Sequence, residues 1–317
     1  MAITKALTAP LFTVVGATGG QGGSVVRALQ ASSLQYRVRA ITRDASKPAA
    51  NALKELGCDV LEADVKTADG VKKAFDGADI GFAMTLTDFT SPDFAEKEYA
   101  EAVLQIDAAK AAGVKTLVWS GMPHISNISG GKQSVAHFEN KANVTTYARS
   151  LGGLKVIDVQ PGTFFSNFLR HNAPRKLEDG SFVLTMAANP DTKLPVIDID
   201  ADYGKYVISA LENGSVDTVL AAPEYITPTQ VVEAFAKASG KNVSFTCVPD
   251  EQLQAILTKV RGEVPAVNMV AMFRAVREVG YYVGADLAPS NKILSTPARK
   301  IDEMLAANPK GVAELFA

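Results

Sequence analysis

The sequence predicts an α/β protein with a doubly wound parallel sheet of the Rossmann type and a smaller α+β lobe in its C-terminal half. Three observations support this fold class. The first half of the chain alternates short β-rich runs with longer helical patterns, as right-handed βαβ units do. The strand candidates are continuous apolar runs, so both faces of the sheet are expected to be buried. A glycine-rich turn joins the first strand to the first helix.

The predicted strands of the first half are short, and helical segments rich in Ala, Leu, Lys and Glu separate them. Several of these helices stop at a glycine, such as Gly57 or Gly113, which is the usual residue after a helix C-terminus. The expected strands span residues 11–15, 36–42, 59–63, 79–84, 114–120 and 154–159, and the expected helices span 24–31, 49–56, 70–75, 94–112 and 134–151.

The pattern breaks after Pro161, where turn-forming residues become frequent and a hairpin is expected around Asp179 and Gly180. We therefore expect residues 1–160 to form a Rossmann domain, with 200–222 returning to it. Residues 161–199 and 223–317 are expected to form the smaller substrate or partner lobe. The later elements expected are a helix at 201–211, a strand at 217–221, a helix from 227 to about 240, a strand at 242–248, and helices up to about 280.

The glycine-rich turn carries the clearest functional signal. Gly16, Gly19 and Gly22 follow a Gly-x-x-Gly-x-x-Gly spacing between the first strand and the first helix. In such a turn the first glycine permits a tight bend, the second lets the backbone approach a pyrophosphate, and the third lets helix and strand pack closely. The helix N-terminus offers unpaired N–H groups to the phosphates. Because strand, turn and helix occur in this order, dinucleotide binding is favoured over a plain structural turn.

The end of the second strand predicts which dinucleotide binds. An NAD site typically places a carboxylate there for the ribose 2′-hydroxyl, whereas an NADP site places an arginine near the 2′-phosphate. Arg43 occupies this position and Lys47 follows four residues later. A guanidinium fork suits a phosphate, so the expected cofactor is NADP(H). Two alternatives stay open. The Asp44 carboxylate could instead bind a ribose hydroxyl, as in an NAD site, or Arg43 could be a solvated loop residue that does not contact the cofactor.

Two residues at later strand ends are expected beside the cofactor. Asp64 follows the third strand and is placed to meet the adenine edge, although it could instead cap the next helix. Thr85 ends the fourth strand and should lie in the crevice at the carboxyl ends of the strands.

The catalytic pair of short-chain dehydrogenases, Tyr-x-x-x-Lys, is missing, because no tyrosine has a lysine four residues later. The helix at that place carries His137 and Lys141, which at i and i+4 share one face. Lys141 is expected to bind the nicotinamide ribose, while His137 is either a proton donor or a structural and ligand-contacting residue. Ser120 stands where such enzymes keep a carbonyl-polarising serine, and His124 in the adjacent loop is a weaker candidate.

Composition narrows the function class. A formal net charge of −2 without a long Lys/Arg run argues against direct nucleic-acid binding. Cys58 and Cys247 have no metal-ligand or redox spacing, so no metal site is expected. No apolar run approaches the roughly 20 residues that span a bilayer. A cytoplasmic protein is expected, with a nuclear location also open.

Taken together, these motifs resemble the NmrA-like family, a branch of the atypical short-chain dehydrogenase/reductase superfamily, over nearly the whole chain. The combination of a histidine–phenylalanine pair, a following lysine and a Phe-x-Asn segment is more specific than the glycine turn alone. The resemblance rests on residues 15–25, on Thr42-Arg43, on 119–121, on His137-Phe138-x-x-Lys141, on 161–167 and on 271–274.

This resemblance implies a set of NADP(H) contacts along the strand ends. A cofactor-contacting lysine that some relatives carry on the fourth helix has no clear match; Ala100 falls at about that place and Lys97 is the nearest substitute. The implied cofactor residues are Gly16, Thr18, Gly19, Gly20, Gln21, Gly22, Arg43, Lys47, Asp64, Val65, Thr85, Lys141, Phe164, Phe165, Ser166 and Asn167.

The resemblance also implies two function classes. Some members bind the dinucleotide without turnover and report redox state through a regulatory protein partner, and the missing tyrosine favours this sensor class here. Others are NADPH-dependent oxidoreductases that reduce quinones, enones or biosynthetic intermediates, and related reductases work with the lysine alone. A small carbonyl or enone substrate is the alternative partner, and the chain is expected as a monomer or homodimer. The loop 123–133 and the segment 222–282 would shape a substrate pocket or a partner surface.

Overall fold

The central sheet confirms the predicted Rossmann class. The computed structural model describes residues 3–213 and 216–317. Residues 1–2 of the expected Rossmann domain and residues 214–215 of its returning segment lie outside the described residues. Within the described residues seven strands pair in the order β11-β6-β5-β4-β1-β2-β3, all in parallel. The strands are β1 Leu11–Val14, β2 Arg37–Thr42, β3 Asp59–Glu62, β4 Ile80–Ala83, β5 Thr116–Trp119, β6 Lys155–Pro161 and β11 Thr218–Ala221.

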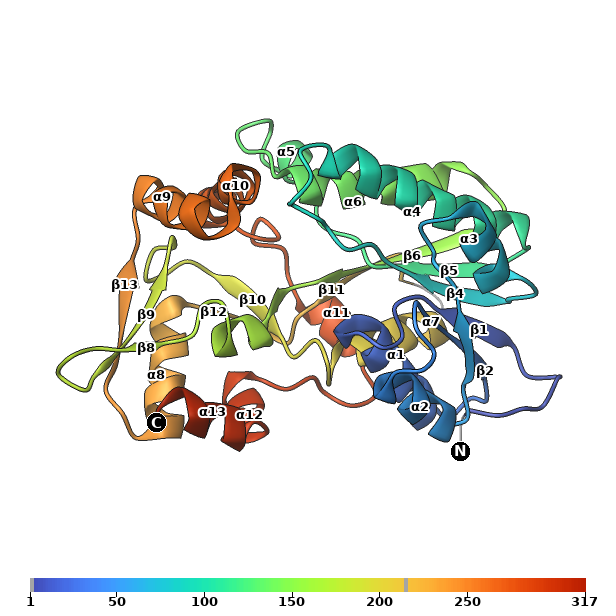
Figure 1. The fold of residues 1–317 in the computed structure, drawn as a ribbon, viewed down its shortest axis with the longest axis horizontal. Helices are drawn as coiled ribbons and strands as arrows, with labels where there is room; N and C mark the ends of the chain where they lie inside the picture. Colours follow the sequence, from blue (N-terminus) through green and yellow to red (C-terminus); the bar gives the residue numbers. More distant parts are fainter. Residues whose placement is uncertain (1–2, 214–215) are drawn as a thin grey trace.

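Helices cover both faces of this sheet (Figure 1). The apolar residues of β1 and of neighbouring strands pack on α1 and α7 on one side, and on α3, α4 and α6 on the other. This arrangement explains why the strands read as continuous apolar runs. The helices of this part are α1 Gly20–Ala31, α2 Pro48–Glu55, α3 Ala68–Phe75, α4 Phe94–Ala111, α5 Ile125–Ile128, α6 Ala136–Ser150 and α7 Tyr203–Asn213.

A smaller lobe with its own core lies beside the carboxyl ends of the strands (Figure 1). Two three-stranded sheets run through it, in the orders β12-β10-β7 and β13-β9-β8. Its strands are β7 Thr163–Phe164, β8 Arg175–Lys176, β9 Phe182–Met186, β10 Leu194–Ile197, β12 Glu224–Ile226 and β13 Val243–Cys247. Its helices are the 3₁₀ turn η1 Phe165–Leu169, α8 Pro228–Ser239, α9 Asp250–Arg261, α10 Glu263–Val279, α11 Ala288–Lys292, α12 Ile301–Ala306 and α13 Pro309–Leu315.

Local signals account for several boundaries. The hairpin expected around Asp179 and Gly180 is confirmed, since β8 and β9 pair in antiparallel and Gly180 has a φ of +83°. Helix α8 starts behind Thr227, which forms a capping box with Gln230. Helix α1 begins at Gly20 rather than at 24, because glycines of the turn are themselves helical and their weak helix propensity hides them from pattern reading.

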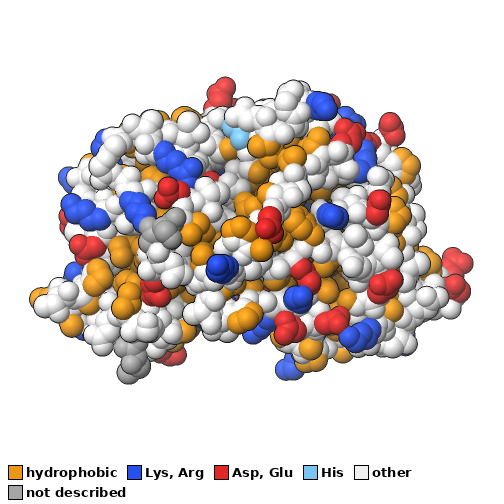
Figure 2. Space-filling view, turned by 180° about the vertical axis from the view of Figure 1, so that it is seen from behind, with side chains coloured by type: hydrophobic (Ala, Val, Ile, Leu, Met, Phe, Trp, Pro, Cys, Tyr) orange, Lys and Arg blue, Asp and Glu red, His pale blue; other side chains and the backbone are white. Residues whose placement is uncertain are grey.

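The return of the chain to the large sheet is visible in α7 and β11, since α7 packs on α1 and β11 pairs with β6. We propose to keep the domain division of 1–160 with 200–222 against 161–199 with 223–317. Among the described residues, no helix is long and apolar enough to cross a membrane. On the reverse face, acidic and basic side chains are interspersed rather than separated (Figure 2).

Candidate functional site

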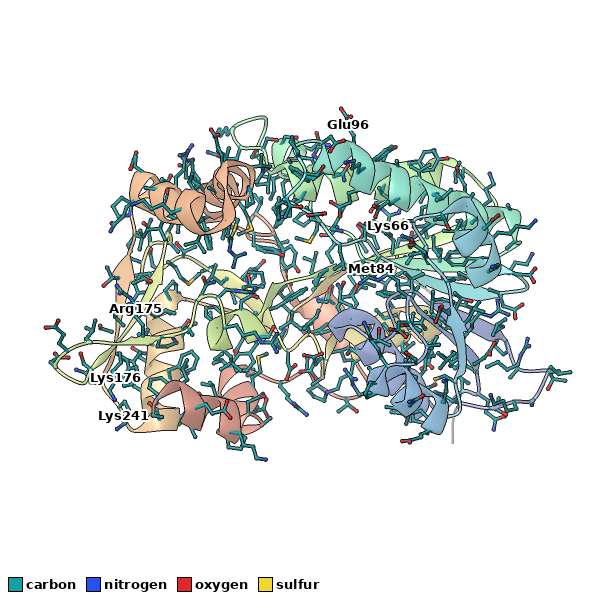
Figure 3. All side chains as sticks on the ribbon, in the orientation of Figure 1. Lys66, Met84, Glu96, Arg175, Lys176 and Lys241 are labelled. Carbon is teal, nitrogen blue, oxygen red and sulfur yellow. The ribbon has the colours of Figure 1, made fainter. Side chains whose placement is uncertain are left out.

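The sheet order places the candidate site where β1 and β4 are neighbours. The connections from β1 run to one edge of the sheet and those from β4 to the other, which makes this pair the topological switch point. In open α/β sheets ligands bind outside the strand carboxyl ends at that point. Lys66 and Met84, just after β3 and β4, lie at the end of the sheet that is nearer the second lobe (Figure 3).

A cleft of about 560 Å³ occupies this position. The glycine turn and Asp200 line it from the Rossmann domain, and Phe164, Ser166 and Arg170, in and beside η1, line it from the smaller lobe. Most of the predicted cofactor residues line it, namely Gly16, Thr18, Gly19, Gly20, Gln21, Gly22, Arg43, Asp64, Val65, Thr85, Phe164 and Ser166.

The geometry of the turn fits a pyrophosphate. Gly16 has a φ of +65°, a conformation that favours glycine. A Cβ at Gly22 would lie 2.3 Å from the Gly16 carbonyl oxygen, so the helix sits directly on the turn. The N-terminus of α1 therefore opens toward the cleft with its N–H groups.

In the segment after β2, only one of the two predicted cationic residues lines the cleft. Arg43 is exposed and lines the cleft, whereas Lys47 does not line it and pairs with Asp44 at 3.7 Å. Asp44 also accepts hydrogen bonds from the Ser46 N–H and hydroxyl, and these bonds lower the pKa of the Asp44 carboxyl. Its carboxylate is therefore engaged locally.

Two other expectations are resolved by contacts. The side chain of Thr67 caps α3 by accepting from the Gly70 N–H at 3.1 Å, so the alternative in which Asp64 caps this helix is wrong. Phe165 is buried in the core of the smaller lobe and lines neither this cleft nor the cavity beyond it.

A second cavity of about 310 Å³ continues from the cleft. The two spaces share Gln21, Met84, Thr85, Leu86 and Phe164. The predicted candidates Ser120, His137, Lys141 and Asn167 all line this second cavity. The fold thus brings the three catalytic candidates together at the end of the cofactor cleft, whereas His124 stays outside it and pairs with Glu139.

Lys141 is held rigidly in the wall of this cavity. Its ammonium donates to the Thr85 carbonyl at 2.9 Å, to the Thr85 hydroxyl at 2.8 Å and to Glu98 Oε1 at 2.6 Å. The Lys141 side chain is 13% exposed and that of Glu98 is 2% exposed. Burial raises the pKa of Glu98, but the Lys141 ammonium and the neighbouring hydroxyls outweigh it and hold that pKa below its usual range. The result is a buried ion pair.

Sequence reasoning missed Glu98, because an acidic residue on a helix reads as solvated. It also missed Arg170, Lys66 and Gln105 as lining residues of the cofactor cleft. Lys97, the nearest substitute for the lysine of relatives, pairs with Asp93 at 3.0 Å and does not line the cleft.

Ser120 follows β5 and accepts a hydrogen bond from the Gln21 amide at 2.7 Å. This bond connects the glycine turn to the wall of the second cavity. His137 packs its ring edge-to-face on Phe89 and Phe138, and its Nδ1 is buried without a hydrogen-bond partner among the described residues. Burial first, and then the Lys141 ammonium, lower the pKa of His137 to about 4, although Glu98 opposes the shift. The imidazole is therefore neutral at pH 7, which favours the ligand-contacting role over that of a charged acid.

This lowered pKa predicts a pH dependence of stability. The pKa of His137 is 6.5 in the unfolded chain and about 4 in the folded chain. Between these two pH values the unfolded chain is protonated at His137 and the folded chain is not. The free energy of unfolding should therefore fall by up to about 3 kcal/mol as the pH drops from 6.5 to 4. His137→Phe should remove this part of the loss in urea unfolding measured at several pH values. At pH 8, where the imidazole is neutral in both states, the slope should match wild type; an unchanged acid slope in the variant would contradict the assignment.

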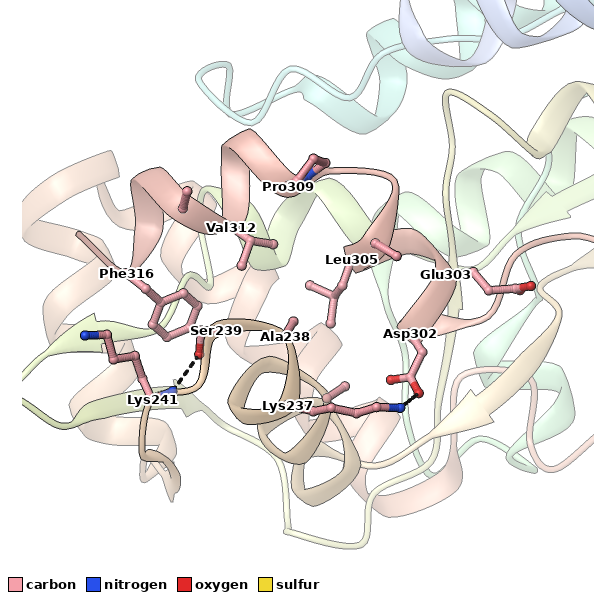
Figure 4. Close-up of a pocket in the computed structure, with 13 residues that line it drawn as sticks. Lys237, Ala238, Ser239, Lys241, Asp302, Glu303, Leu305, Pro309, Val312 and Phe316 are labelled. Carbon is pink, nitrogen blue, oxygen red and sulfur yellow. Dashed lines mark hydrogen bonds and ion pairs between the residues drawn. The ribbon is translucent and has the colours of Figure 1, made fainter.

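Another cavity, about 720 Å³, lies between α8 and the helices α12 and α13 (Figure 4). Helices α12 and α13 lie at the bottom of Figure 1, away from the strand ends of the large sheet. Of the four charged residues that line this cavity, Lys237 and Asp302 pair with each other at 2.6 Å. We therefore place the functional site at the cleft and not here.

Comparison with known proteins decides the family. The model of the NmrA-like family matches residues 9–315. The chain belongs to the NmrA-like family. Its curated relatives include the NmrA-like family domain-containing oxidoreductase PtmS of Penicillium ochrochloron, 32% identical over 75% of this chain and 76% of that protein.

Solved structures share the fold at lower identity. NmrA, a negative transcriptional regulator crystallised with NADP and also with NAD, is 22% identical and superposes with a TM-score of 0.78, covering 95% of this chain and 96% of that one. The NADPH-dependent quinone oxidoreductase QOR2 of Escherichia coli, complexed with NADPH, is 19% identical with a TM-score of 0.72, covering 95% and 99%. The same fold is thus found in a regulator and in a reductase.

Proposed function

We propose that this chain is an NADPH-dependent reductase of an apolar conjugated carbonyl compound, such as a quinone or an enone. The observation that carries the proposal is the second cavity, which opens from the catalytic end of the cofactor cleft and is lined mainly by apolar side chains. An apolar chamber beside Lys141 offers room for an apolar acceptor next to the nicotinamide. The curated relative PtmS bears the name of an oxidoreductase, which supports the same class.

The residues of the cleft fit the two halves of the cofactor. The N-terminus of α1 and the glycine turn would hold the pyrophosphate, Arg43 the 2′-phosphate and Lys141 the nicotinamide ribose. When bound, the nicotinamide supplies a hydride, and solvent supplies the proton that completes the two-electron reduction.

The chain itself would orient the substrate by hydrogen bonds and exclude water with the apolar wall of the second cavity. The hydroxyl of Ser120 lies in the wall of the second cavity and can donate to a substrate oxygen. The ammonium of Lys141 is fixed by Thr85 and Glu98, so it would be held in place beside the nicotinamide ribose. An activated acceptor needs little acid assistance, which is compatible with a site that has no Tyr-x-x-x-Lys pair.

The test is NADPH oxidation followed at 340 nm with a panel of quinones, enones and small aldehydes. Turnover is expected with the apolar conjugated acceptors and not with the small aldehydes. Met272→Trp, which fills the second cavity from α10, should reduce turnover at least tenfold while NADPH binding is kept. Bound NADPH that stays unconsumed across the whole panel would instead support the dinucleotide-responsive regulator that the missing tyrosine favours.

The choice of NADP over NAD rests on Arg43. Arg43→Ala should weaken NADP binding about 10- to 100-fold and leave NAD binding nearly unchanged, because a charge-assisted hydrogen bond to phosphate is worth about 1.5–3 kcal/mol. Lys47→Ala is the matched control and should have the smaller effect, since Lys47 pairs with Asp44. Calorimetric titration of both cofactors measures this. Equal losses for NADP and NAD would show that Arg43 does not recognise the 2′-phosphate.

A further inference from the structure

The second cavity has polar groups on the side of the Rossmann domain and on the side of the smaller lobe. Its catalytic end is formed by residues of the Rossmann side, among them Thr85, Ser120 and Lys141. Its other wall comes from the smaller lobe, where Arg261 at the end of α9 and His171 and Asn172 after η1 line the same space. The cavity therefore has polar groups from both lobes.

The rest of the wall is mainly apolar and adaptable. Five of the seven methionines of the chain line it: Met84, Met122, Met186, Met269 and Met272. Methionine side chains adjust their shape and make favourable contacts with aromatic rings. Phe138, Phe273 and Tyr281 complete the wall, which suits a flat conjugated body.

Arg261 is the charged group on the side of the smaller lobe. Its Nη2 lies 3.2 Å from Nδ1 of His171. Since a guanidinium only donates, this ring nitrogen accepts the hydrogen bond. No other hydrogen bond of the Arg261 guanidinium is found among residues 3–213 and 216–317, so its remaining N–H groups can donate.

Two arginines of the neighbouring helix α10 form ion pairs with a carboxylate. Arg274 and Arg277 on α10 both bind Asp250, at 2.8 Å and 2.9 Å. Arg261, by contrast, has no carboxylate within ion-pair distance among residues 3–213 and 216–317. Arg261 and His171 are exposed to solvent and also line the cavity, so their donors can reach an anionic group bound there.

We propose that Arg261 and His171 recognise an anionic group, in the first instance a carboxylate, on the part of the substrate that reaches the smaller lobe. This specifies the substrate class of the proposed function as an apolar conjugated compound with an acidic substituent, and it rests on that function only in taking the ligand of this cavity to be the hydride acceptor. Arg261 is then a specificity-determining residue rather than a catalytic one, because it contacts the part of the substrate that does not react.

The test compares two probes that differ only in charge, anthraquinone-2-carboxylate and anthraquinone-2-carboxamide, in binding titrations with the full-length protein. Wild type should bind the carboxylate at least tenfold more tightly than the carboxamide. Arg261→Gln should weaken the carboxylate at least tenfold and change the carboxamide less than twofold. Lys259→Gln is the matched control: it removes the same charge from the same helix outside the cavity and should leave both affinities unchanged.

Equal binding of the two probes by wild type would overturn the proposal. So would a loss that Arg261→Gln inflicts equally on both probes, or one that Lys259→Gln reproduces. These titrations involve no turnover, so they stand apart from the test of the reductase function. A protein that reduces anthraquinone-2-carboxylate at a rate insensitive to Arg261→Gln would keep the reductase function and lose this inference.

Discussion

Gly22→Ala should abolish NADPH binding at the concentrations that saturate wild type, a loss of about 100-fold or more, which corresponds to about 2.7 kcal/mol. The physical reason is a clash with backbone, since the new Cβ would meet the Gly16 carbonyl oxygen at 2.3 Å and the Ala17 nitrogen at 2.8 Å. Backbone cannot swing aside as a side chain does. The first turn of α1 must therefore move off the strand–helix bend that receives the pyrophosphate.

Gly23→Ala provides the matched control for this variant. A Cβ at Gly23 lies 3.3 Å from the flexible end of Arg27 and 3.4 Å from the Ala17 carbonyl oxygen, so small adjustments suffice. Alanine is also the better helix former, by about 1 kcal/mol. Gly23→Ala should bind NADPH as wild type does and unfold at an equal or higher temperature. Comparable affinities for wild type and Gly22→Ala would show that the turn does not cradle the cofactor.

Lys141→Met should destabilise the fold by about 3–5 kcal/mol, the second large effect. Removal of the ammonium leaves the Glu98 carboxylate, 2% exposed, without its cation, and an unpaired buried charge is costly. Glu98→Gln combined with Lys141→Met removes that charge as well, so the double variant should recover most of the stability. Chemical denaturation of the four proteins of this cycle measures the coupling.

The pH dependence of this cycle has a definite sign. In wild type the pKa of Glu98 lies below its unfolded value of 4.5, so its stabilising contribution is present above that pH and is lost as the pH falls through the folded value. In Lys141→Met burial alone should raise the Glu98 pKa, so protonation of this carboxyl toward acid should reduce the stability difference between wild type and variant. A difference in the free energy of unfolding that stays constant as the pH falls would contradict the buried pair.

The same cycle separates structure from function. The double variant regains its fold but has no ammonium for the nicotinamide ribose. It should therefore still bind NADPH more weakly than wild type and show no turnover with the acceptors of wild type. Restored turnover in the double variant would make Lys141 a structural residue only.

Local chemistry made much of the site predictable. The glycine spacing, the strand–turn–helix order and the apolar runs depend on residues that are neighbours in the chain, and these features located the cleft, the sheet class and the hairpin at Gly180. Arg43 and Thr85 followed, because the carboxyl ends of parallel strands meet at one edge.

Other features depend on packing between distant segments and had no local signal. Lys47 reads as a second phosphate ligand, yet it pairs with Asp44 and does not line the cleft. Phe165 reads as a cofactor contact within its motif, yet it fills the core of the smaller lobe. A charge pattern along the chain cannot say which partner a flexible cation reaches first, because the answer depends on the three-dimensional surroundings.

The sequence by itself determined the family, the Rossmann sheet and the dinucleotide cradle, because each rests on the short-range geometry of glycines, strands and helix ends. Only the tertiary structure decided the rest. It joined Glu98 of α4 to Lys141 of α6 across 43 residues of chain, lowered the pKa of His137 by burial, and gathered methionines from both lobes around one apolar cavity. Burial and charge pairing are properties of the space a side chain shares, and that space exists only once the chain has folded.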